Sequence, residues 1–492
     1  MSMIKVENLT FSYPASYDCI FENTSFQIDS DWKLGFIGRN GRGKTTFLKL
    51  LLGELEYSGK IISSVQFDYF PYHVHDKGRM TLEILYEVCP AAEDWELIRE
   101  LSYLELEADV LYRPFDTLSN GEQTKVLLSA LFLNEGHFLL IDEPTNHLDM
   151  HAREIVAGYL KKKKGFILVS HDRSFIDGCV DHILSINKAG IEVQKGNFSS
   201  WWENRRRQDA MEAAANERLK KEVNRLSDAA RRSASWSDKV EKSKIGEKNS
   251  GLRPDRGYIG HKAAKMMKRS KTIEARQQQA IEQKSGLLKN LETTDELALR
   301  PLSYHRDVLL SMSGLSVSYG DKSVFPPLSL TLRQGERIAL DGKNGSGKSS
   351  LLKLVTGEPV AHSGTLSIGS QLVISYVPQD ASQLHGGLSD YAEARGIDES
   401  LFKTILRKLG FERVQFQKDM ADFSAGQKKK VLLAGSLCER AHLYIWDEPL
   451  NYIDVYSRMQ IEKLITRYAP TMIFVEHDRA FRELIATKTI EL

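Results

Sequence analysis

A repeated glycine-rich segment constrains this chain more than any other feature of its sequence. The segment GRNGRGKTTFLKLL at 38–51 is echoed by GKNGSGKSSLLKLV at 342–355. Three more pairs follow in the same order: LSNGEQTKVLLSALF and FSAGQKKKVLLAGSL, LLIDEPTNHLD and YIWDEPLNYID, SHDRSF and EHDRAF. The offsets are 304 residues for Lys44 and Lys348, 305 for Glu143 and Glu448, and 306 for His171 and His477. Because chance does not produce four ordered matches, the chain consists of two homologous halves.

Each half has the pattern of an α/β nucleotide-binding lobe. A β-rich opening precedes a strand, the glycine-rich loop, a helical stretch and short apolar strands such as FLLID and FILVS. Residues from about 200 to 300 belong to neither copy. We therefore expect a first lobe at 1–199, a linker at 200–300 and a second lobe at 301–492.

Both glycine-rich segments fit the pattern G-x-x-x-x-G-K-[ST], in which backbone N–H groups cradle phosphates at the N-terminus of a helix. We expect Lys44 and Lys348 to reach the terminal phosphates of ATP, and Thr45 and Ser349 to ligate Mg²⁺. The remaining loop residues expected to hold ATP are Gly38, Asn40, Gly41, Gly43, Thr46, Gly342, Asn344, Gly345, Gly347 and Ser350.

Paired carboxylates end an apolar run in each half. We assign Asp142 and Asp447 to the metal, and Glu143 and Glu448 to polarising the attacking water. A histidine follows a second apolar strand in each half, and we expect it to hydrogen-bond the terminal phosphate and the water. These histidines are His171 and His477. The chain is thus predicted to hydrolyse ATP at two sites.

Two further motifs resemble the signature of ABC ATPases: Leu118-Ser119-Asn120-Gly121-Glu122-Gln123 and Phe423-Ser424-Ala425-Gly426-Gln427. In that family the signature of one lobe caps the ATP bound by the other. The resemblance implies that Ser424, Gly426 and Gln427 complete the first site. Ser119, Gly121 and Glu122 would complete the second, with helix N-termini directed at the phosphate. Tyr319 resembles the family's adenine-stacking aromatic residue, and Tyr13 its counterpart, with Tyr17 as an alternative.

The two sites are predicted to be unequal. The second half has Tyr376-Val377-Pro378-Gln379, which is similar to the glutamine loop of the family, so Gln379 is expected to contact Mg²⁺ and water. The first half has Tyr69-Phe70-Pro71-Tyr72, with a tyrosine in place of the glutamine. We expect two competent sites that differ in rate.

The string Asp142-Glu143-Pro144-Thr145-Asn146-His147-Leu148-Asp149, the tandem lobes and the charged linker together resemble the ABC-F proteins, soluble ATPases that bind the ribosome. The linker has helical periodicity through Met211, Ala215 and Leu219 and again from about 261, with a glycine- and proline-containing turn between. An α-helical hairpin with its tip near 238–262 is therefore expected.

Basic residues concentrate at this tip. Residues 231–276 hold 14 Lys or Arg against 5 Asp or Glu, whereas the whole chain has a net charge of only +1. Interleaved aromatic and basic side chains are what RNA binding requires. The candidate RNA-binding residues are Arg231, Arg232, Lys239, Lys242, Lys244, Lys248, Arg253, Arg256, Tyr258 and Lys262, with Tyr258 as the candidate nearest a drug pocket.

Within ABC-F, the chain looks most like the Lsa-type resistance proteins, because the lysine-to-signature distance of 75 and 76 residues leaves no arm insertion. The resemblance implies a monomer that inserts its hairpin into the exit site of the 70S ribosome. There it would contact 23S rRNA near the peptidyl-transferase centre and the P-site tRNA, and release lincosamides, pleuromutilins and streptogramin A.

Three other functions remain as alternatives: a housekeeping ABC-F translation factor, the ATPase subunit of a transporter, and a DNA-repair or cohesin-like ATPase. A transporter subunit would have no need of a basic hairpin. ATPases of the DNA-repair or cohesin-like class have a split lobe or added zinc modules, which this sequence does not show. Apolar runs such as HFLLI are far below the roughly 18 residues that cross a bilayer. The four cysteines form no ligand spacing. We therefore expect a cytoplasmic protein without membrane or DNA partners.

Overall fold

The computed structural model describes residues 3–13, 19–146, 148–187, 190–242, 297–319 and 322–492. Its contacts group into two compact units: one combines Met1–Trp201 with Thr294–Leu492, and the other is Trp202–Thr293. Both predicted lobes belong to the first unit, and most of the predicted linker forms the second.

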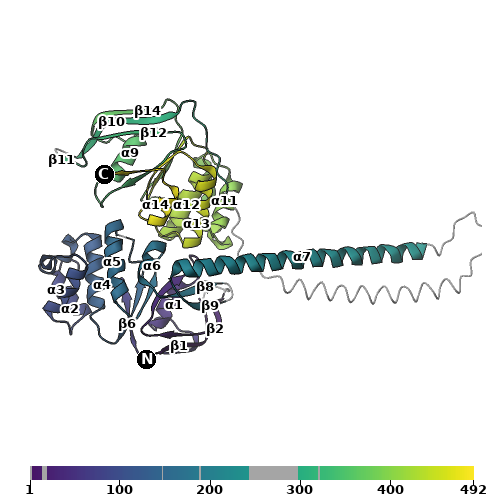
Figure 1. Cartoon of the computed structure of the whole chain (residues 1–492), viewed down its shortest axis with the longest axis horizontal. Coiled ribbons are helices and arrows are strands. Elements are labelled where there is room, and N and C mark those ends of the chain that lie inside the picture. Colours follow the sequence, from purple (N-terminus) through teal and green to yellow (C-terminus); the bar gives the residue numbers. More distant parts are fainter. Residues whose placement is uncertain (1–2, 14–18, 147, 188–189, 243–296, 320–321) are drawn as a thin grey trace, which may run out of the picture. The chain divides into compact units, whose positions relative to one another are not determined.

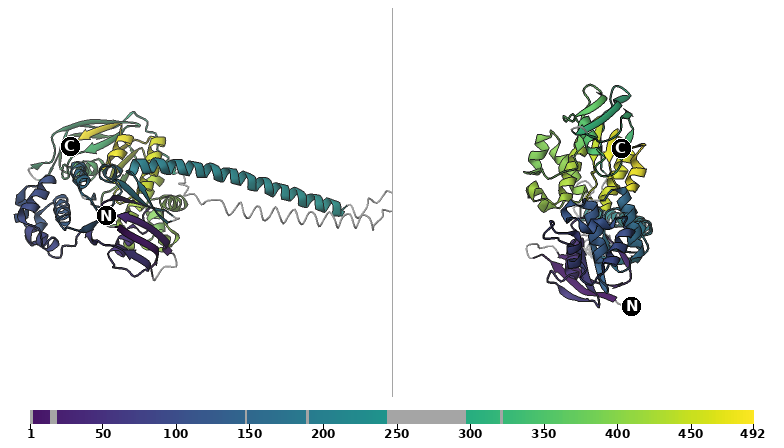
Figure 2. Two further views of the ribbon diagram at one scale, coloured as in Figure 1. Left: turned by 60° about the horizontal axis from the view of Figure 1, so that its bottom comes forward. Right: turned by 90° about the vertical axis from the view of Figure 1, so that its left-hand side faces the viewer.

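The first lobe is built on a six-stranded sheet in the order β5-β6-β7-β3-β8-β9. Neighbouring strands pair in parallel except for β8 and β9. A separate antiparallel sheet has the order β2-β1-β4 and is visible in purple near the N-terminus in Figure 2. The strands are β1 (Met3–Ser12), β2 (Cys19–Asp29), β3 (Lys33–Ile37), β4 (Ser58–Ile62), β5 (Gln66–Phe70), β6 (His137–Asp142), β7 (Phe166–Val169), β8 (His182–Asn187) and β9 (Gly190–Lys195).

The helices of the first lobe connect these strands and cover the sheet. Side-chain caps fix several of their starts: the Asp149 carboxylate, for example, accepts a hydrogen bond from the Ala152 N–H at the N-terminus of α5. The helices are α1 (Lys44–Leu51), α2 (Thr81–Val88), α3 (Asp94–Tyr103), α4 (Asn120–Leu131), α5 (Met150–Lys162) and α6 (Arg173–Cys179).

The second lobe repeats this plan with a parallel sheet in the order β15-β16-β17-β13-β18. In Figure 1, strands β10, β12 and β14 gather on one side of α9, and helices α11 to α14 on the other. Its strands are β10 (Val308–Tyr319), β11 (Lys322–Ser323), β12 (Leu328–Arg333), β13 (Arg337–Asp341), β14 (His362–Ile368), β15 (Ile374–Val377), β16 (Leu443–Asp447), β17 (Met472–Val475) and β18 (Lys488–Glu491). Its helices are α9 (Lys348–Val355), α10 (Leu388–Ala394), α11 (Glu399–Lys408), α12 (Ala425–Cys438), α13 (Val455–Tyr468) and α14 (Arg479–Ile485).

The burial of the central strands explains why the short apolar runs of the sequence form parallel strands. Strands β7 and β17 are buried at every residue, as expected for parallel strands covered on both faces. Their side chains join the apolar cores of the lobes, where Phe36, Phe47 and Phe474 are fully buried. The predicted α/β class with tandem lobes is confirmed.

The common strand order places the chemistry at one edge of each sheet. The glycine-rich loop follows β3 or β13, the paired carboxylates end β6 or β16, and the histidine follows β7 or β17. Because these three strands are neighbours and parallel, their carboxyl ends meet at the same edge. In each lobe, three of the four repeated motifs therefore lie together at the same edge of the sheet.

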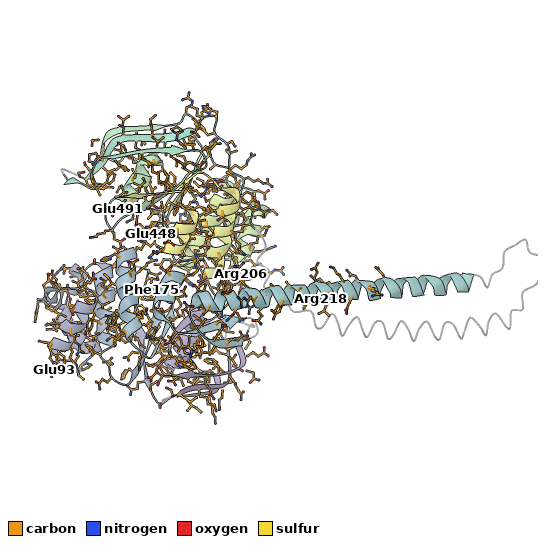
Figure 3. The ribbon with its side chains drawn as sticks, viewed as in Figure 1. Glu93, Phe175, Arg206, Arg218, Glu448 and Glu491 are labelled. Atoms are coloured by element: carbon orange, nitrogen blue, oxygen red, sulfur yellow. The ribbon has the colours of Figure 1, made fainter. Side chains whose placement is uncertain are left out.

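The linker begins with one long helix, α7 (Phe198–Lys242), which at 1.5 Å per residue is about 68 Å long. Ion pairs one turn apart support it, such as Arg205 Nε to Asp209 Oδ1 at 3.0 Å. Arg206 and Arg218 project from its exposed surface (Figure 3). Arg231, Arg232, Lys239 and Lys242 belong to α7, whereas the predicted second helix and Lys244, Lys248, Arg253, Arg256, Tyr258 and Lys262 lie outside the described residues.

Among the helices that the structure describes, none combines the length and the apolar character needed to cross a lipid bilayer.

Candidate functional site

The two glycine-rich loops have the same local geometry. Gly43 and Gly347 precede α1 and α9 with φ of 92° and 91°, a conformation that favours glycine. The ammonium of Lys44 donates a hydrogen bond to the Gly38 carbonyl at 2.7 Å, and Lys348 does the same to Gly342 at 2.7 Å. Each loop is thus curled around its own lysine, with the N-terminus of a helix beneath it.

Oxygen ligands suited to Mg²⁺ lie beside each loop. Thr45 Oγ1 donates to Asp142 Oδ2 at 2.9 Å. In the second lobe Ser349 hydrogen-bonds Asp447, whose Oδ1 is buried without a hydrogen-bond partner among the described residues. Hydroxyl and carboxylate oxygens are the ligands that Mg²⁺ prefers, so both residue pairs fit this ion.

The two glutamates adopt a backbone conformation that is rare for non-glycine residues. Glu143 has φ of 52° and Glu448 has φ of 47°. His171 Nε2 lies 3.2 Å from Glu143 Oε1, and His477 Nε2 lies 3.3 Å from Glu448 Oε1. The structure therefore brings each predicted glutamate and histidine together, in the same arrangement in both lobes.

The electrostatic environments of the two glutamates are opposite. Burial, with the nearby charge of Asp142, raises the pKa of Glu143 to about 8. Burial would also raise the pKa of Glu448, but hydrogen bonds from His477 and Gln379 and the charge of His477 lower it to about 2. The two sites differ in charge as well as in sequence.

His171 shares the buried setting of Glu143. Burial and then the positive charges of Lys44 and Arg458 lower the pKa of His171 well below its usual value. At neutral pH its imidazole is therefore uncharged.

The first pocket has a volume of about 540 Å³ and is lined by both lobes. The first lobe contributes most of the predicted nucleotide-binding and catalytic residues, and the second lobe contributes the signature residues that the family resemblance assigned to this site. The predicted residues that line it are Tyr13, Asn40, Gly41, Gly43, Lys44, Thr45, Thr46, Asp142, Glu143, His171, Ser424, Gly426 and Gln427.

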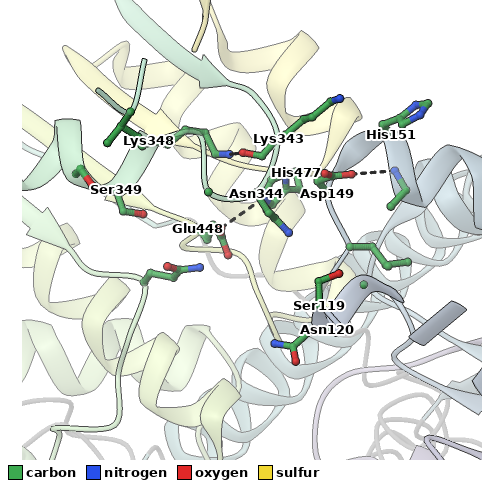
Figure 4. A pocket seen from close by; sticks show the side chains of 18 of the residues that line it. Ser119, Asn120, Asp149, His151, Lys343, Asn344, Lys348, Ser349, Glu448 and His477 are labelled. Atoms are coloured by element: carbon green, nitrogen blue, oxygen red, sulfur yellow. Dashed lines mark hydrogen bonds and ion pairs between the residues drawn. The ribbon is translucent and has the colours of Figure 1, made fainter. Parts of the chain in front are cut away.

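The second pocket is larger, about 1110 Å³, and has the reverse composition (Figure 4). Its predicted lining residues are Ser119, Gly121, Glu122, Tyr319, Asn344, Gly345, Gly347, Lys348, Ser349, Ser350, Gln379, Glu448 and His477. Of the residues predicted for the ATP sites, three line neither pocket: Gly38 and Gly342, whose carbonyls bind the loop lysines, and Asp447, which is buried beside Glu448.

The signature serines cap the helices that point into these pockets. Ser119 Oγ accepts the Glu122 N–H at 3.3 Å, and the Glu122 carboxylate accepts the Ser119 N–H at 2.7 Å. Ser424 and Gln427 form the same reciprocal pair at 3.3 and 2.9 Å. Both are capping boxes, which fix the first turns of α4 and α12.

The first pocket is closed by a direct contact between the lobes. Asn40 Nδ2 donates to the Tyr452 carbonyl at 2.7 Å. A Cβ added at Gly426 would lie 2.8 Å from that same carbonyl oxygen and 3.4 Å from Asn40 Nδ2. Glycine at 426 therefore leaves room for Tyr452, in the turn after β16 of the same lobe, to pack against α12, and the carbonyl of this tyrosine contacts the phosphate loop of the other lobe.

The candidate adenine-stacking tyrosines occupy matching positions. The Tyr13 hydroxyl lies 3.0 Å from Thr46 Oγ1, and the Tyr319 hydroxyl lies 3.0 Å from Ser350 Oγ. Both rings are exposed, at 40% and 59%. The alternative, Tyr17, lies outside the described residues.

The tyrosine that replaces the loop glutamine in the first lobe points elsewhere. The Tyr72 hydroxyl donates to Glu87 Oε1 at 3.3 Å, and Tyr72 does not line the first pocket. Tyr69 donates to Asp142 Oδ2 at 3.1 Å instead. Gln379 has no equivalent among the residues that line the first pocket.

Some lining residues were not predicted from the sequence. The segments that follow the paired carboxylates contribute Tyr452 to the first pocket, and Asn146, Leu148 and Asp149 to the second. Their repetition within LLIDEPTNHLD and YIWDEPLNYID was a signal that could have identified them. Gly410, Phe411 and Gln415 lie outside the repeated motifs and carried no such signal.

Comparison with known families and proteins matches this geometry. The family model described as ABC transporter matches residues 21–146 and 325–451, one match in each lobe. The chain is 27% identical over 485 residues to the ribosome protection protein VmlR of Bacillus subtilis, which covers 96% of this chain and 84% of that protein. It is 26% identical over 488 residues to the ATP-binding protein Uup of Caulobacter vibrioides, covering 96% and 74%.

Solved structures share the fold. A chain in the complex of the archaeal ribosomal stalk protein aP1 with the archaeal ribosome recycling factor aABCE1 superimposes with a TM-score of 0.62 at 20% identity, covering 98% of this chain and 87% of that one. The structure titled RNase-L Inhibitor gives the same TM-score and identity, covering 99% and 87%. These similarities support the tandem arrangement of two lobes.

Proposed function

Because this chain belongs to the ABC transporter family and hydrolyses ATP with Mg²⁺, we propose that it uses ATP to act on the ribosome and protect it from antibiotics of the peptidyl-transferase centre. The observation that carries the proposal is the similarity to a ribosome protection protein across 96% of the chain. The drug classes are lincosamides, pleuromutilins and streptogramin A, and a ribosomal partner implies the cytoplasm.

The geometry supports the roles that we propose for the site residues. Lys44 and Lys348 bind the terminal phosphates in place of the carbonyls that they now contact. Glu143 and Glu448 accept the proton of the attacking water, and His171 and His477, 3.2 and 3.3 Å away, orient them. Thr45 with Asp142, and Ser349 with Asp447, would hold Mg²⁺, with Gln379 as a further ligand, and an ion held there would supply positive charge to neutralise the phosphates.

Each site becomes complete only when residues of both lobes surround the nucleotide. Ser424 and Gly426 cap the first pocket, and Ser119 and Gly121 the second. The N-terminal N–H groups of α12 and α4 would then stabilise the charge that develops on the transferred phosphate. ATP binding thus favours the closed arrangement of the lobes, and hydrolysis removes the group that stabilises it.

The linker hairpin is proposed to carry this change to the ribosome. The basic residues that follow the exposed arginines of α7 would pair with rRNA phosphates near the exit site, and the tip would reach the drug pocket and the P-site tRNA. Tyr258 is our candidate for the tip residue. Drug leaves as RNA and tRNA are displaced.

Resistance in a susceptible host tests the proposal. We would express the chain, or its Glu143→Gln variant, and measure inhibitory concentrations of a lincosamide, a pleuromutilin and a streptogramin A, with a macrolide as control. Inhibitory concentrations of the first three should rise with the native chain, and the variant should lose the effect. No rise with soluble, ATP-hydrolysing protein would refute protection in that host.

A translation factor that relieves stalled ribosomes is the second candidate. The chain is almost as similar in sequence to Uup as to VmlR, and the name of Uup mentions ATP binding but no drug. This similarity supports the translation factor as an alternative function. Trapping separates ribosome binding from resistance: the Glu143→Gln, Glu448→Gln double variant should co-sediment with ribosomes in ATP and leave when ATP is removed. Retention without resistance would favour the translation factor, and ready dissociation in ATP would contradict both.

A further inference from the structure

A buried lysine distinguishes the second site from the first. Lys429 lies on α12, five residues after the helix-capping Ser424, and is 3% exposed. Its ammonium donates hydrogen bonds to the carbonyl oxygens of Pro378 at 3.0 Å and Glu448 at 3.2 Å, and contacts that of Asp447 at 3.5 Å. An ammonium has three N–H donors, so three carbonyl acceptors satisfy it.

The first lobe has a different residue at this position. Alignment of the two signature segments pairs Lys429 with Thr124, whose hydroxyl donates to the Asn120 carbonyl of its own helix at 2.9 Å. The next position is lysine in both lobes, and its role is shared: Lys430 donates to Leu409 O at 2.6 Å, and Lys125 to Leu104 O at 3.0 Å. The buried ammonium at 429 therefore has no counterpart at the aligned position of the first lobe.

The acceptors of Lys429 belong to two separate catalytic segments. Asp447 ends strand β16 and Glu448 follows it directly, whereas Pro378 immediately precedes Gln379, which lines the second pocket. Gln379 in turn hydrogen-bonds Glu448. Burying an ammonium is expensive unless its partners are well placed, so this cluster fixes the distance between the two segments.

We propose that Lys429 is a positioning residue of the second ATP site, which ties the loop bearing Gln379 to the turn bearing Asp447 and Glu448. It touches neither nucleotide nor water, because it does not line the pocket. Through these contacts it keeps Gln379 and Glu448 in position to face the terminal phosphate of ATP. The first site lacks both the lysine and the glutamine, and this paired difference sets the two sites apart.

The test requires turnover from the second site alone. In a Glu143→Gln background we would compare Lys429→Met, which keeps the length of the side chain without its charge, with the parent. Lys428→Met is the matched control: it removes the same charge one residue away on the same helix, from a partly exposed side chain outside the pocket. Thermal unfolding of each variant checks that it is folded.

The expected result separates turnover from binding. Lys429→Met should lower kcat about tenfold and leave the KM for ATP within about twofold, because the residues that bind ATP are untouched. The control should keep both parameters. A parent-like kcat in folded Lys429→Met, or an equal loss in Lys428→Met, would overturn the proposal.

A double-mutant cycle identifies the route of the effect. If Lys429 acts through Gln379, adding Lys429→Met to Gln379→Ala should cost little further kcat, so the two losses do not add. Additive losses would contradict the route. If Lys429→Met fails to fold, Lys429→Arg and Lys429→Gln replace it: the charged variant should retain more kcat than the neutral one, and equal values would refute the proposal.

This inference rests on the proposed role of Glu448 and on no ribosomal partner. All measurements use the isolated full chain, so failure of ribosome binding leaves them unaffected. Loss of the remaining turnover on adding Glu448→Gln to the Glu143→Gln background establishes that the second site is being measured.

Discussion

At the scale of single residues, Glu143 and Glu448 hold a left-handed backbone conformation in both lobes. Such a conformation costs a non-glycine residue on the order of 1–3 kcal/mol and persists only where the surroundings impose it. Here the N–H of each glutamate is bound by the neighbouring strand, at Val169 O and Val475 O. Repetition of the strain in two homologous copies argues that it aims the carboxylates at the pocket.

Replacement of these glutamates should separate binding from hydrolysis. Glu143→Gln with Glu448→Gln keeps the shape of both side chains but removes the proton acceptor, so hydrolysis should fall about 100-fold or more. Phosphate release measures hydrolysis, and equilibrium dialysis measures bound ATP. Each single variant should retain turnover from the other site, and a double variant that still hydrolyses at the native rate would exclude this role.

Asp454 should contribute to stability in a pH-dependent way. It caps α13 and pairs with Lys430 at 2.9 Å, both side chains being buried. Burial would raise the pKa of Asp454, but the charge of Lys430 and the Ser457 N–H hold it well below its usual value. A lowered folded-state pKa stabilises the protein above the unfolded value of about 4, and this stability is lost as pH falls below it.

Asp454→Asn tests this contribution. The variant should lose about 3–5 kcal/mol of unfolding free energy at neutral pH, because Lys430 stays buried without its partner. The loss should shrink as the solution is acidified from about pH 5 towards pH 2. Asp31→Asn, at an exposed position, is the control and should change little. Urea unfolding across this pH range is the measurement, and a constant difference would contradict the linkage.

At the scale of elements, the sequence predicted the α/β class and the apolar runs that end in functional motifs, but it did not predict which strands are neighbours. The strand order β6-β7-β3 follows from parallel pairing of runs that each end in a functional motif, and the lobes repeat it as β16-β17-β13. The pairing of each glycine-rich loop with the opposite signature came from the family resemblance, because no local pattern specifies a contact between halves. Lys429 and Tyr69 were missed, since each acts through contacts distant in sequence.

Gly426 should be intolerant of a methyl group. Gly426→Ala places a Cβ 2.8 Å from the Tyr452 carbonyl, so α12 and the turn that carries Tyr452 must separate, which disturbs the hydrogen bond from Asn40 of the first phosphate loop to that carbonyl. ATP turnover measured in a Glu448→Gln background, where the first site works alone, should drop about tenfold or more.

Gly158→Ala is the matched control for this substitution. Gly158 lies within α5, and a Cβ there meets nothing within 4 Å. Alanine should raise the unfolding free energy by about 0.5–1 kcal/mol through its higher helix propensity, without affecting turnover. Equal turnover in the Gly426→Ala and Gly158→Ala variants would show that the packing of α12 against Tyr452 is unimportant for catalysis.

At the scale of the whole molecule, the homologous arginines Arg173 and Arg479 form ion pairs between the lobes that differ greatly in burial. Arg173, which opens α6 just after His171, makes two contacts with Glu462 on α13, one of them 3.1 Å, and their side chains are 13% and 5% exposed. Its homologue Arg479 contacts Glu154 at 3.5 Å, with exposures of 57% and 58%. The ion pair of Arg173 is therefore buried, whereas that of its homologue Arg479 is exposed to solvent.

Disruption of the buried pair should impair closure far more than disruption of the exposed one. Arg173→Ala leaves Glu462 buried and unpaired, which is expected to cost about 3–5 kcal/mol in the closed arrangement. ATP turnover at subsaturating ATP should fall, whereas Arg479→Ala should behave like the native chain. Exchange of the charges, Arg173→Glu with Glu462→Arg, should restore part of the loss, and a charge exchange no better than the single variant would argue against the pair.

Because residues of both lobes line each pocket, we expect that neither half of the chain hydrolyses ATP by itself. The linker supplies each lobe to the other at a fixed effective concentration, so catalysis by the intact chain is independent of how dilute the protein is. Two separately produced halves would behave as partners in an ordinary bimolecular equilibrium, with activity rising as the product of their concentrations until the complex saturates. Because the two lobes are covalently linked, the ATPase activity per molecule should not depend on the concentration of the protein.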